Sequence, residues 1–519
     1  MQMLQWVAGT LVVALAGCGG SSGGTEASAT GGMASTGGSS SGGSSPTSST
    51  GDTASATGTG TSVSGSNTDG MTSAPTTGMT TDPTATSTDP TATTAATTGT
   101  TAVTGESSSS SGVIGGSSTT GTSDTTGVAE SSTSAADSSS SSTGGPPPPC
   151  EPGMGMGMGG KVEKSFIWVS SFNLHEMSKI DTLTMTELAR YKTGPAGENP
   201  SRTAVSADGR FVVVNNRDSG RSTMVAANLE DCIDKNGNGQ IDTSQNKANI
   251  LAFGADECVR WSIVLPYAGN HQSGPRGVTW TPGEWDYDLC KYVEPKVWVG
   301  YLAAGNVAHF ARIDGETGVV EETLLAPGWK GASGYGPYGA ALDPQFRPWF
   351  SSLRSEFIRV NTDENPITLT RIDPPAYVQS YGFTIDRDGD AWFGGWTGPV
   401  TVYDQKAQTF TPIVGTSGAH RGVAADENFV WAANNAPCGL IQVDRKNRTL
   451  IAKHVPNPCS TPIGLSIDVE KFVWLIDQNA RAWKFAADNV MGMQLMNVAG
   501  SHYVYSDMTG GQLLSILPQ

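Results

Sequence analysis

A short pattern that repeats along the second part of the chain limits its fold more than any other feature. Each copy has a glycine within an apolar run, an aspartate a few residues later, a turn, and then an aromatic strand. The clearest copies are residues 337–343 before Trp349, 380–386 before Trp392, 420–426 before Trp431, and 462–468 before Trp474. Self-similarity of this kind indicates a fold built from copies of one unit.

The spacing of the copies identifies the unit. The apolar anchors of successive copies are Trp168, Val212, Trp298, Trp349, Trp392, Trp431 and Trp474. Most neighbouring anchors lie about forty to fifty residues apart, the period of a four-stranded propeller blade. Within a period we expect short alternating strands, as at residues 422–425, 430–433, 439–444 and 449–453. The sequence therefore predicts an all-β fold, a seven-bladed β-propeller at residues 161–519.

The two ends of this region predict how the ring closes. The first copy, which begins at Phe166, lacks the lead-in strand of the others, and residues 502–505 near the C-terminus supply a spare strand. If the two pair, no blade edge is left bare. An open β-solenoid is the alternative architecture.

The spacing and the Gly-apolar…Asp-Gly-x-x-Trp pattern resemble the seven-bladed propellers of the streptogramin B lyase-like group. In that family a histidine pair and a glutamate act with magnesium in an elimination. The best local match is His420-Arg421-Gly422 leading to Asn434. Gly422 stands where a second histidine is expected and Asn434 where a carboxylate is expected, so the resemblance implies the fold and argues against the activity. His420 and Arg421 stay the catalytic candidates.

One position of the repeat is expected to face the mouth of the central channel. The residues before or at the repeated glycine include Arg202, Arg276, Tyr338, Tyr381 and Arg421. Arginine and tyrosine donors in an acidic protein suit an anionic or sugar-like ligand. Alternatively, these side chains stack between the blades and bond one another.

The N-terminus predicts export and lipidation. An apolar run from Leu4 to Ala16 has the length of a signal-peptide core and is too short for a membrane span. Residues 15–18, Leu-Ala-Gly-Cys, resemble the lipobox of bacterial lipoproteins, although no Lys or Arg precedes the run. We expect residues 1–18 to be the signal and Cys18 to hold the protein to the outer membrane or cell surface. An ordinary cleaved signal is the alternative.

Residues 19–160 are nearly all Ser, Thr, Gly, Ala and Pro with Gly-Met repeats near the end. Such a segment buries too little apolar surface to fold, so we expect a disordered linker. The net charge of the chain is -17, which argues against nucleic acid as a partner. We expect a monomer.

An insertion near residues 230–258 has the pattern of a calcium loop. Oxygen-bearing side chains alternate as in the first nine positions of an EF-hand-type loop, and Gly239 permits the sharp turn. The expected ligands of a structural calcium ion are Asp234, Asn236, Asn238, the carbonyl of Gln240, Asp242, and a returning carboxylate from Asp256 or, as we prefer, Glu257. A metal-free turn rich in Asn and Gly is the alternative.

Besides Cys18 the chain has six cysteines, an even number that suggests disulfides in an exported protein. Cys232 and Cys258 bracket the calcium loop, and Cys438 and Cys459 bracket a predicted hairpin. Elimination leaves Cys150 with Cys290.

Together these features predict a surface-anchored binding module whose ligand is a small molecule, a glycan or a protein. The alternative is a lyase-like or lactonase-like propeller enzyme that acts on an ester or lactone with a metal in the central channel. The sequence shows no serine-hydrolase elbow in the folded region, no His-Glu-x-x-His and no phosphate loop.

Overall fold

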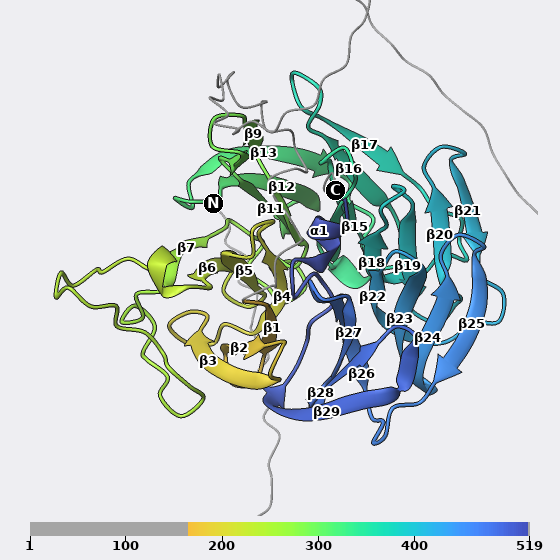
Figure 1. Ribbon diagram of the computed structural model, residues 1–519. Helices are drawn as coiled ribbons and strands as arrows, with labels where there is room; N and C mark the ends of the chain where they lie inside the picture. Colours follow the sequence, from red (N-terminus) through yellow and green to blue (C-terminus); the bar gives the residue numbers. More distant parts are fainter. Residues whose placement is uncertain (1–163, 517–519) are drawn as a thin grey trace, which may run out of the picture. The chain divides into compact units, whose positions relative to one another are not determined.

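The computed structural model describes residues 164–516, which form a seven-bladed β-propeller (Figure 1). The expected all-β fold and the number of blades are confirmed. The signal, Cys18 and the linker lie outside the described residues. No helix among those described is long and apolar enough to cross a membrane.

Each blade is an antiparallel sheet whose strands run in order from the channel to the rim. The first three blades are built as follows: β1 (Phe166–Ser171), β2 (Glu176–Asp181) and β3 (Thr186–Lys192); β4 (Pro200–Val205), β5 (Phe211–Asn216), β6 (Arg221–Ala226) and β7 (Val259–Val264); β8 (Val278–Thr281), β11 (Lys296–Ala303), β12 (Val307–Asp314) and β13 (Val320–Pro327). A small hairpin, β9 (Glu284–Asp286) and β10 (Lys291–Val293), is inserted between β8 and β11.

The last four blades are regular. Their strands are β14 (Gly339–Leu342), β15 (Pro348–Ser351), β16 (Phe357–Asn361) and β17 (Thr368–Ile372); β18 (Ser380–Ile385), β19 (Ala391–Gly395), β20 (Thr401–Asp404) and β21 (Thr409–Pro412); β22 (His420–Ala425), β23 (Phe429–Asn435), β24 (Cys438–Asp444) and β25 (Thr449–His454); β26 (Pro462–Ile467), β27 (Phe472–Asp477), β28 (Asn479–Ala486) and β29 (Asn489–Ser501). Two 3-10 turns, Leu229–Asp231 and Ala332–Gly334, and one helix, α1 (Gly511–Ile516), complete the described chain.

The repeated aspartate and tryptophan form one hydrogen-bonded unit, which explains why they recur together. Trp392 Nε1 donates to Asp386 Oδ2 at 2.9 Å, while Asp386 Oδ1 accepts the backbone N–H groups of Asp388 and Asp390. The same pairing joins Trp349 to Asp343, Trp431 to Asp426 and Trp474 to Asp468. The carboxylate thus shapes the turn and satisfies the indole, so that the ring can be buried between blades without an unpaired donor.

The repeated glycine lets neighbouring inner strands approach. A Cβ at Gly382 would lie 1.7 Å from the carbonyl oxygen of Arg421 in the next blade. A Cβ at Gly464 would lie 2.6 Å from the carbonyl oxygen of Val504. Only a residue without a side chain fits these positions, so the glycines set the close spacing of strands around the channel.

The ring closes as the sequence predicts. Residues 502–508, here called the closing segment, take the innermost place in the first blade. Ser171 bridges to His502, and the N–H of Trp168 donates to the carbonyl of Met508 at 2.9 Å. In Figure 1 the C-terminal part accordingly lies at the centre of the ring, beside β1 and β4.

Two predicted disulfides are confirmed, Cys232–Cys258 and Cys438–Cys459, with Cα–Cα distances of 4.4 and 6.0 Å. Cys290 is also disulfide-bonded. Its expected partner, Cys150, lies outside the described residues.

Candidate functional site

The inner strands of successive blades run in the same direction, so their first residues gather at one end of the channel. This end is here called the axial face. It brings together all five residues that the sequence assigns to ligand binding. Arg202 lies over the ring of Tyr338 at 4.8 Å, and Arg276 lies 5.6 Å from the same ring. Tyr338 donates a hydrogen bond to Tyr381 at 3.0 Å, and Arg421 stacks on Tyr381 at 4.4 Å.

The closing segment adds two tyrosines to this face. The hydroxyl of Tyr503 contacts those of Tyr338 and Tyr381, and Tyr381 donates to Tyr505 at 3.2 Å. Four phenol groups therefore form one hydrogen-bonded cluster on the axis, here called the tyrosine cluster. Burial raises the pKa of Tyr338, Tyr381 and Tyr505 well above the ordinary value. These three phenols are therefore neutral at physiological pH.

The axial face has an outer tier nearer the solvent. Arg354 from the turn after β15, Trp396 from the turn after β19, and Arg421 from β22 are all half-buried. The guanidinium of Arg354 lies 4.4 Å from the centre of the Trp396 ring, and that of Arg421 lies 4.8 Å from it. An indole flanked by two cations is thus exposed at the mouth, with three successive blades contributing one residue each.

The arginines of the axial face differ in their partners from arginines that lie farther from the axis. Away from the axis, Arg371 pairs with Glu356, and Arg445 pairs with Asp386 and Asp388. Within residues 164–516 no carboxylate forms an ion pair with the five arginines that gather at the axis, which are Arg202, Arg217, Arg276, Arg354 and Arg421. The axial face is therefore cationic in a chain whose net charge is -17.

The catalytic candidate His420 points away from this face. Its side chain is 0 % exposed, and Cβ of His420 lies against Gly394 of the neighbouring blade. Burial lowers the pKa of His420 to about 4, and the charged groups that act on it are the cations Arg421 and Lys453. A neutral, enclosed imidazole without a carboxylate beside it is a poor base for an incoming substrate.

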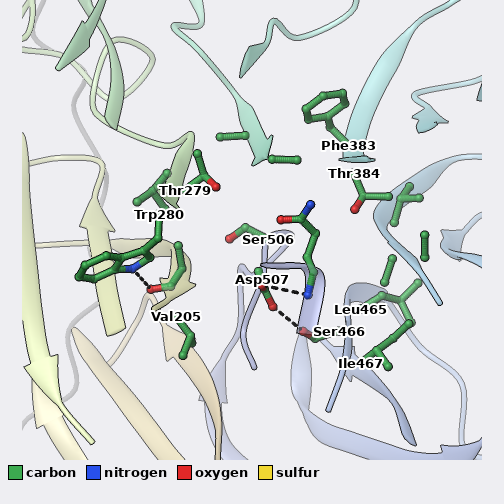
Figure 2. A pocket seen from close by; sticks show the side chains of 18 residues that line it. Val205, Thr279, Trp280, Phe383, Thr384, Leu465, Ser466, Ile467, Ser506 and Asp507 are labelled. Atoms are coloured by element: carbon green, nitrogen blue, oxygen red, sulfur yellow. Dashed lines mark hydrogen bonds between the residues drawn. The ribbon is translucent and has the colours of Figure 1, made fainter. Parts of the chain in front are cut away.

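At its other end the channel holds a small cavity (Figure 2), and Gln512 of α1 is among the residues that line it. Thr279, Thr384 and Ser466 line it, together with Ser506 and Asp507 of the closing segment. Gln512 Nε2 donates to the carbonyl of Leu342 at 2.9 Å, which holds α1 across the channel end. Asp507 accepts the N–H groups of Gly510 and Gln512 and so caps the helix rather than facing a ligand.

The side chains of the predicted calcium loop converge. Asn236 Nδ2 and Asn238 Nδ2 both donate to Asp242 Oδ2, at 2.7 and 3.0 Å. Asp234 accepts the backbone N–H groups of Gly237, Asn238 and Gly239. The two asparagine side chains therefore converge on Asp242, while Asp234 holds the loop backbone, and all four side chains carry hard oxygen donors.

Glu257, the expected sixth ligand, has another task in the described structure. Its carboxylate is 2 % exposed and accepts the backbone N–H groups of Lys235, Asn236 and Asp242 at 2.7–3.1 Å. Glu257 therefore stabilises the backbone conformation of the loop. Within residues 164–516 no three His, Cys, Asp or Glu side chains gather in a metal-binding arrangement, and the loop relies on two aspartates and two asparagines.

Besides Tyr503 and Tyr505 of the closing segment, sequence reasoning missed three side chains of the axial face, Arg217, Arg354 and Trp396. Each lies in the turn after the second strand of its blade, outside the repeat position that was compared. The signal that would have revealed them is a polar or aromatic residue a few positions after the aromatic anchor, as Trp396 follows Trp392.

No protein-family model matches the sequence, and neither does any curated protein. Many solved structures match the chain. A catalytically inactive virginiamycin B lyase from Staphylococcus aureus with quinupristin has 14% identity and a TM-score of 0.39, with 61% of this chain and 94% of that chain covered. AztD from Citrobacter koseri has 11% identity, a TM-score of 0.42 and coverage of 66% and 97%. A functionally unknown protein from Desulfotomaculum acetoxidans has 14% identity, a TM-score of 0.45 and coverage of 66% and 98%. At these identities the likeness concerns the fold, and no activity follows from it.

Proposed function

We propose that this protein is a lipid-anchored binding module whose propeller takes an anionic ligand at the axial face. The observation that carries the proposal is the pair of half-buried arginines at this face, Arg354 and Arg421, which lie on either side of Trp396 and have no carboxylate partner among the described residues. Guanidinium groups bind carboxylate, sulfate and phosphate groups in a bidentate manner. The ring of Trp396 lies against both Arg354 and Arg421 and so holds the two cations beside each other.

Binding is a better account of this face than catalysis. The hydrolytic or lyase alternative needs a base, a metal and an accessible path between them, and His420 offers an enclosed ring beside cations. The anchor at Cys18 belongs to the proposal because the Leu-Ala-Gly-Cys pattern at residues 15–18 follows an apolar export signal. The outer membrane or cell surface is the location that the anchor favours.

The binding proposal predicts selective affinity for an acidic glycan. Titration calorimetry of the full chain should detect trigalacturonate, and neutral maltotriose should bind at least tenfold more weakly. Arg421→Gln should reduce trigalacturonate affinity about tenfold, because one charge-assisted pair is worth about 1.5–3 kcal/mol. Raising the salt concentration should weaken binding further.

Arg371→Gln is the matched control, because Arg371 pairs with Glu356 on an outer strand and lies away from the axis. It should bind trigalacturonate as the unchanged protein does. Equal affinity for both trisaccharides, or equal losses in the two variants, would contradict the proposal. So would the absence of binding to trigalacturonate, sulfate and pyrophosphate alike.

We further propose that calcium stabilises the insertion. The donor set of Asp234, Asn236, Asn238 and Asp242 suits a hard cation, and the side chains of the two asparagines already contact Asp242. Rotation of the two amides would turn their oxygens toward an ion. The Cys232–Cys258 disulfide fixes the base of the loop and lowers the entropy lost on ordering it.

Calcium should therefore raise the melting temperature of the full chain by about 2 °C for each tenfold increase above its dissociation constant. Asp234→Ala should remove this response, because the loop loses one of two carboxylates. The comparison variant is Asp444→Ala, which removes a similar turn-capping carboxylate at the β24–β25 turn. It should be less stable yet keep the calcium response, and a response that survives Asp234→Ala would refute the site.

A further inference from the structure

The most unusual side chain of the axial face is Arg202. It is 0 % exposed, and Nε, Nη1 and Nη2 all lack a hydrogen-bond partner in the described structure. Arg276 is equally buried but donates to the carbonyl oxygens of His271, Gln272 and Gly274 at 2.7–3.2 Å. Only Nε of Arg276 lacks a partner, so the fold satisfies two of the three nitrogens of that guanidinium and none of those of Arg202.

Aromatic rings stabilise Arg202 only in part. Its guanidinium lies 4.8 Å from the ring of Tyr338 and 4.5 Å from that of Tyr505, so stacking contacts cover the charge. The five N–H donors of a guanidinium lie in its plane, however, and a ring above or below that plane accepts none of them in a normal hydrogen bond. The donor edge of Arg202 is therefore still without an acceptor.

The charges around Arg202 make the missing acceptor more unfavourable. Arg276 lies near Tyr338, and Arg217 stacks on Tyr503 at 4.0 Å, so three buried cations surround the tyrosine cluster. Tyr338, Tyr381 and Tyr505 are neutral at physiological pH for the reason given above. Burial alone would raise the pKa of Tyr503, but Arg276, Arg217 and Arg202 together hold it below the ordinary value. A buried, unpaired charge costs several kcal/mol, and here no carboxylate offsets it.

The strand that carries Arg202 continues toward the cavity at the other end of the channel. Ser506 Oγ accepts the N–H of Thr203 at 3.0 Å and donates to its carbonyl at 2.6 Å, so the closing segment and β4 are joined directly beside Arg202. Ala204, the residue after Thr203 on β4, and Ser506 itself line that cavity. The cavity thus begins two residues along β4 from Arg202.

We propose that Arg202 binds a small inorganic anion of the size of chloride, held in the interior of the propeller beneath the tyrosine cluster. The anion accepts the in-plane N–H donors and neutralises part of the charge of the three buried arginines. It must be small, because Arg202 has no contact with solvent. This site is separate from the outer tier of Arg354, Trp396 and Arg421 and does not depend on the ligand proposed there.

The test compares thermal unfolding of the full chain in sodium chloride and in sodium gluconate at equal ionic strength. Chloride should raise the melting temperature by about 2 °C per tenfold increase above its dissociation constant, because it binds only the folded protein. Arg202→Met keeps the length of the side chain, removes the donors and should abolish the difference between the two salts. Arg354→Met, on the outer tier, should keep it.

Crystals of the unchanged protein soaked in bromide give an independent measurement. An anomalous peak within hydrogen-bond distance of the Arg202 guanidinium is expected. If Arg202→Met does not fold, the bromide experiment decides alone. The proposal is overturned if no peak lies at Arg202, if melting is the same in both salts, or if Arg202→Met still responds to chloride. Equal melting combined with a phenolate absorbance at neutral pH that Tyr503→Phe removes would show instead that Tyr503 supplies the counter-charge.

Discussion

A chain that stops after Gly500 should fail to form a cooperatively unfolding propeller. The truncation removes the closing segment, which supplies the innermost strand of the first blade. In the intact protein Met508 accepts the N–H of Trp168, His502 bridges to Ser171, and Ser506 bonds the backbone of Thr203. Without it the inner edge of β1 is left unpaired beside the channel, and an unpaired edge of this kind favours aggregation.

The size of the effect follows from what the closing segment buries. Val504, Tyr505 and Met508 are 0–3 % exposed. Each such side chain contributes roughly 1.5–3 kcal/mol by leaving water, so together they approach the total stability of a typical domain, about 5–15 kcal/mol. Chemical denaturation followed by tryptophan fluorescence should show a broad transition or none, and limited proteolysis should cleave the truncated chain rapidly.

A second truncation, after Gly510, separates the contribution of ring closure to stability from that of the packing of α1. It removes α1 with its Gln512 contacts to Leu342 and Ile385 but keeps the closing segment. This shorter deletion should cost only about 1–3 kcal/mol of unfolding free energy, since it removes a few hydrogen bonds and one buried apolar side chain. A chain ending at Gly500 that unfolds as sharply as the intact protein would contradict the role assigned to the closing segment.

The fold was predictable because its determinants are local and repeated. In four copies the glycine stands four residues before the aspartate and the tryptophan five or six residues after it, and each of the three residues has a direct physical reason. In the sixth blade the strands predicted at 422–425 and 449–453 agree with β22 (His420–Ala425) and β25 (Thr449–His454) to within two residues. The hairpin β9–β10 and helix α1 were missed because their short segments show no period of their own.

The candidate site was predictable only in part. Their position in the repeat identified Arg202, Tyr338 and Tyr381 as residues of the axial face. The inner strands all run in the same direction, so they all begin at that end of the channel. Position in the repeat did not decide between His420 and Arg421: the former is fully buried and the latter is half-buried at the axial face, where the pairing of β22 with β23 is irregular between His420 and Val423. Arg354 and Trp396 meet only through the arrangement of successive blades, and a single sequence does not reveal such contacts.

Replacing Trp392 with alanine should lower the free energy of unfolding by about 3–5 kcal/mol. Trp392 is 0 % exposed and packs among Val402, Ile413, Val423 and Val430 at the interface of two blades. Its removal leaves a cavity that regular strands on both sides prevent from collapsing. Urea denaturation of the full chain measures the loss of unfolding free energy. The measurement uses both the midpoint of the transition and the slope of the unfolding free energy against urea concentration.

Two further variants identify the cause of the stability loss in Trp392→Ala. Trp396→Ala removes an identical side chain four residues away, but Trp396 is half-buried at the axial face, so the loss should be about 1 kcal/mol or less. Trp392→Phe keeps most of the buried ring and removes the donor to Asp386, whose Oδ2 still accepts from Arg445 at 3.3 Å. A loss of about 1–2 kcal/mol there would separate the hydrogen bond from the packing. Equal losses for Trp392→Ala and Trp396→Ala would mean that the repeat is not held together by its buried indoles.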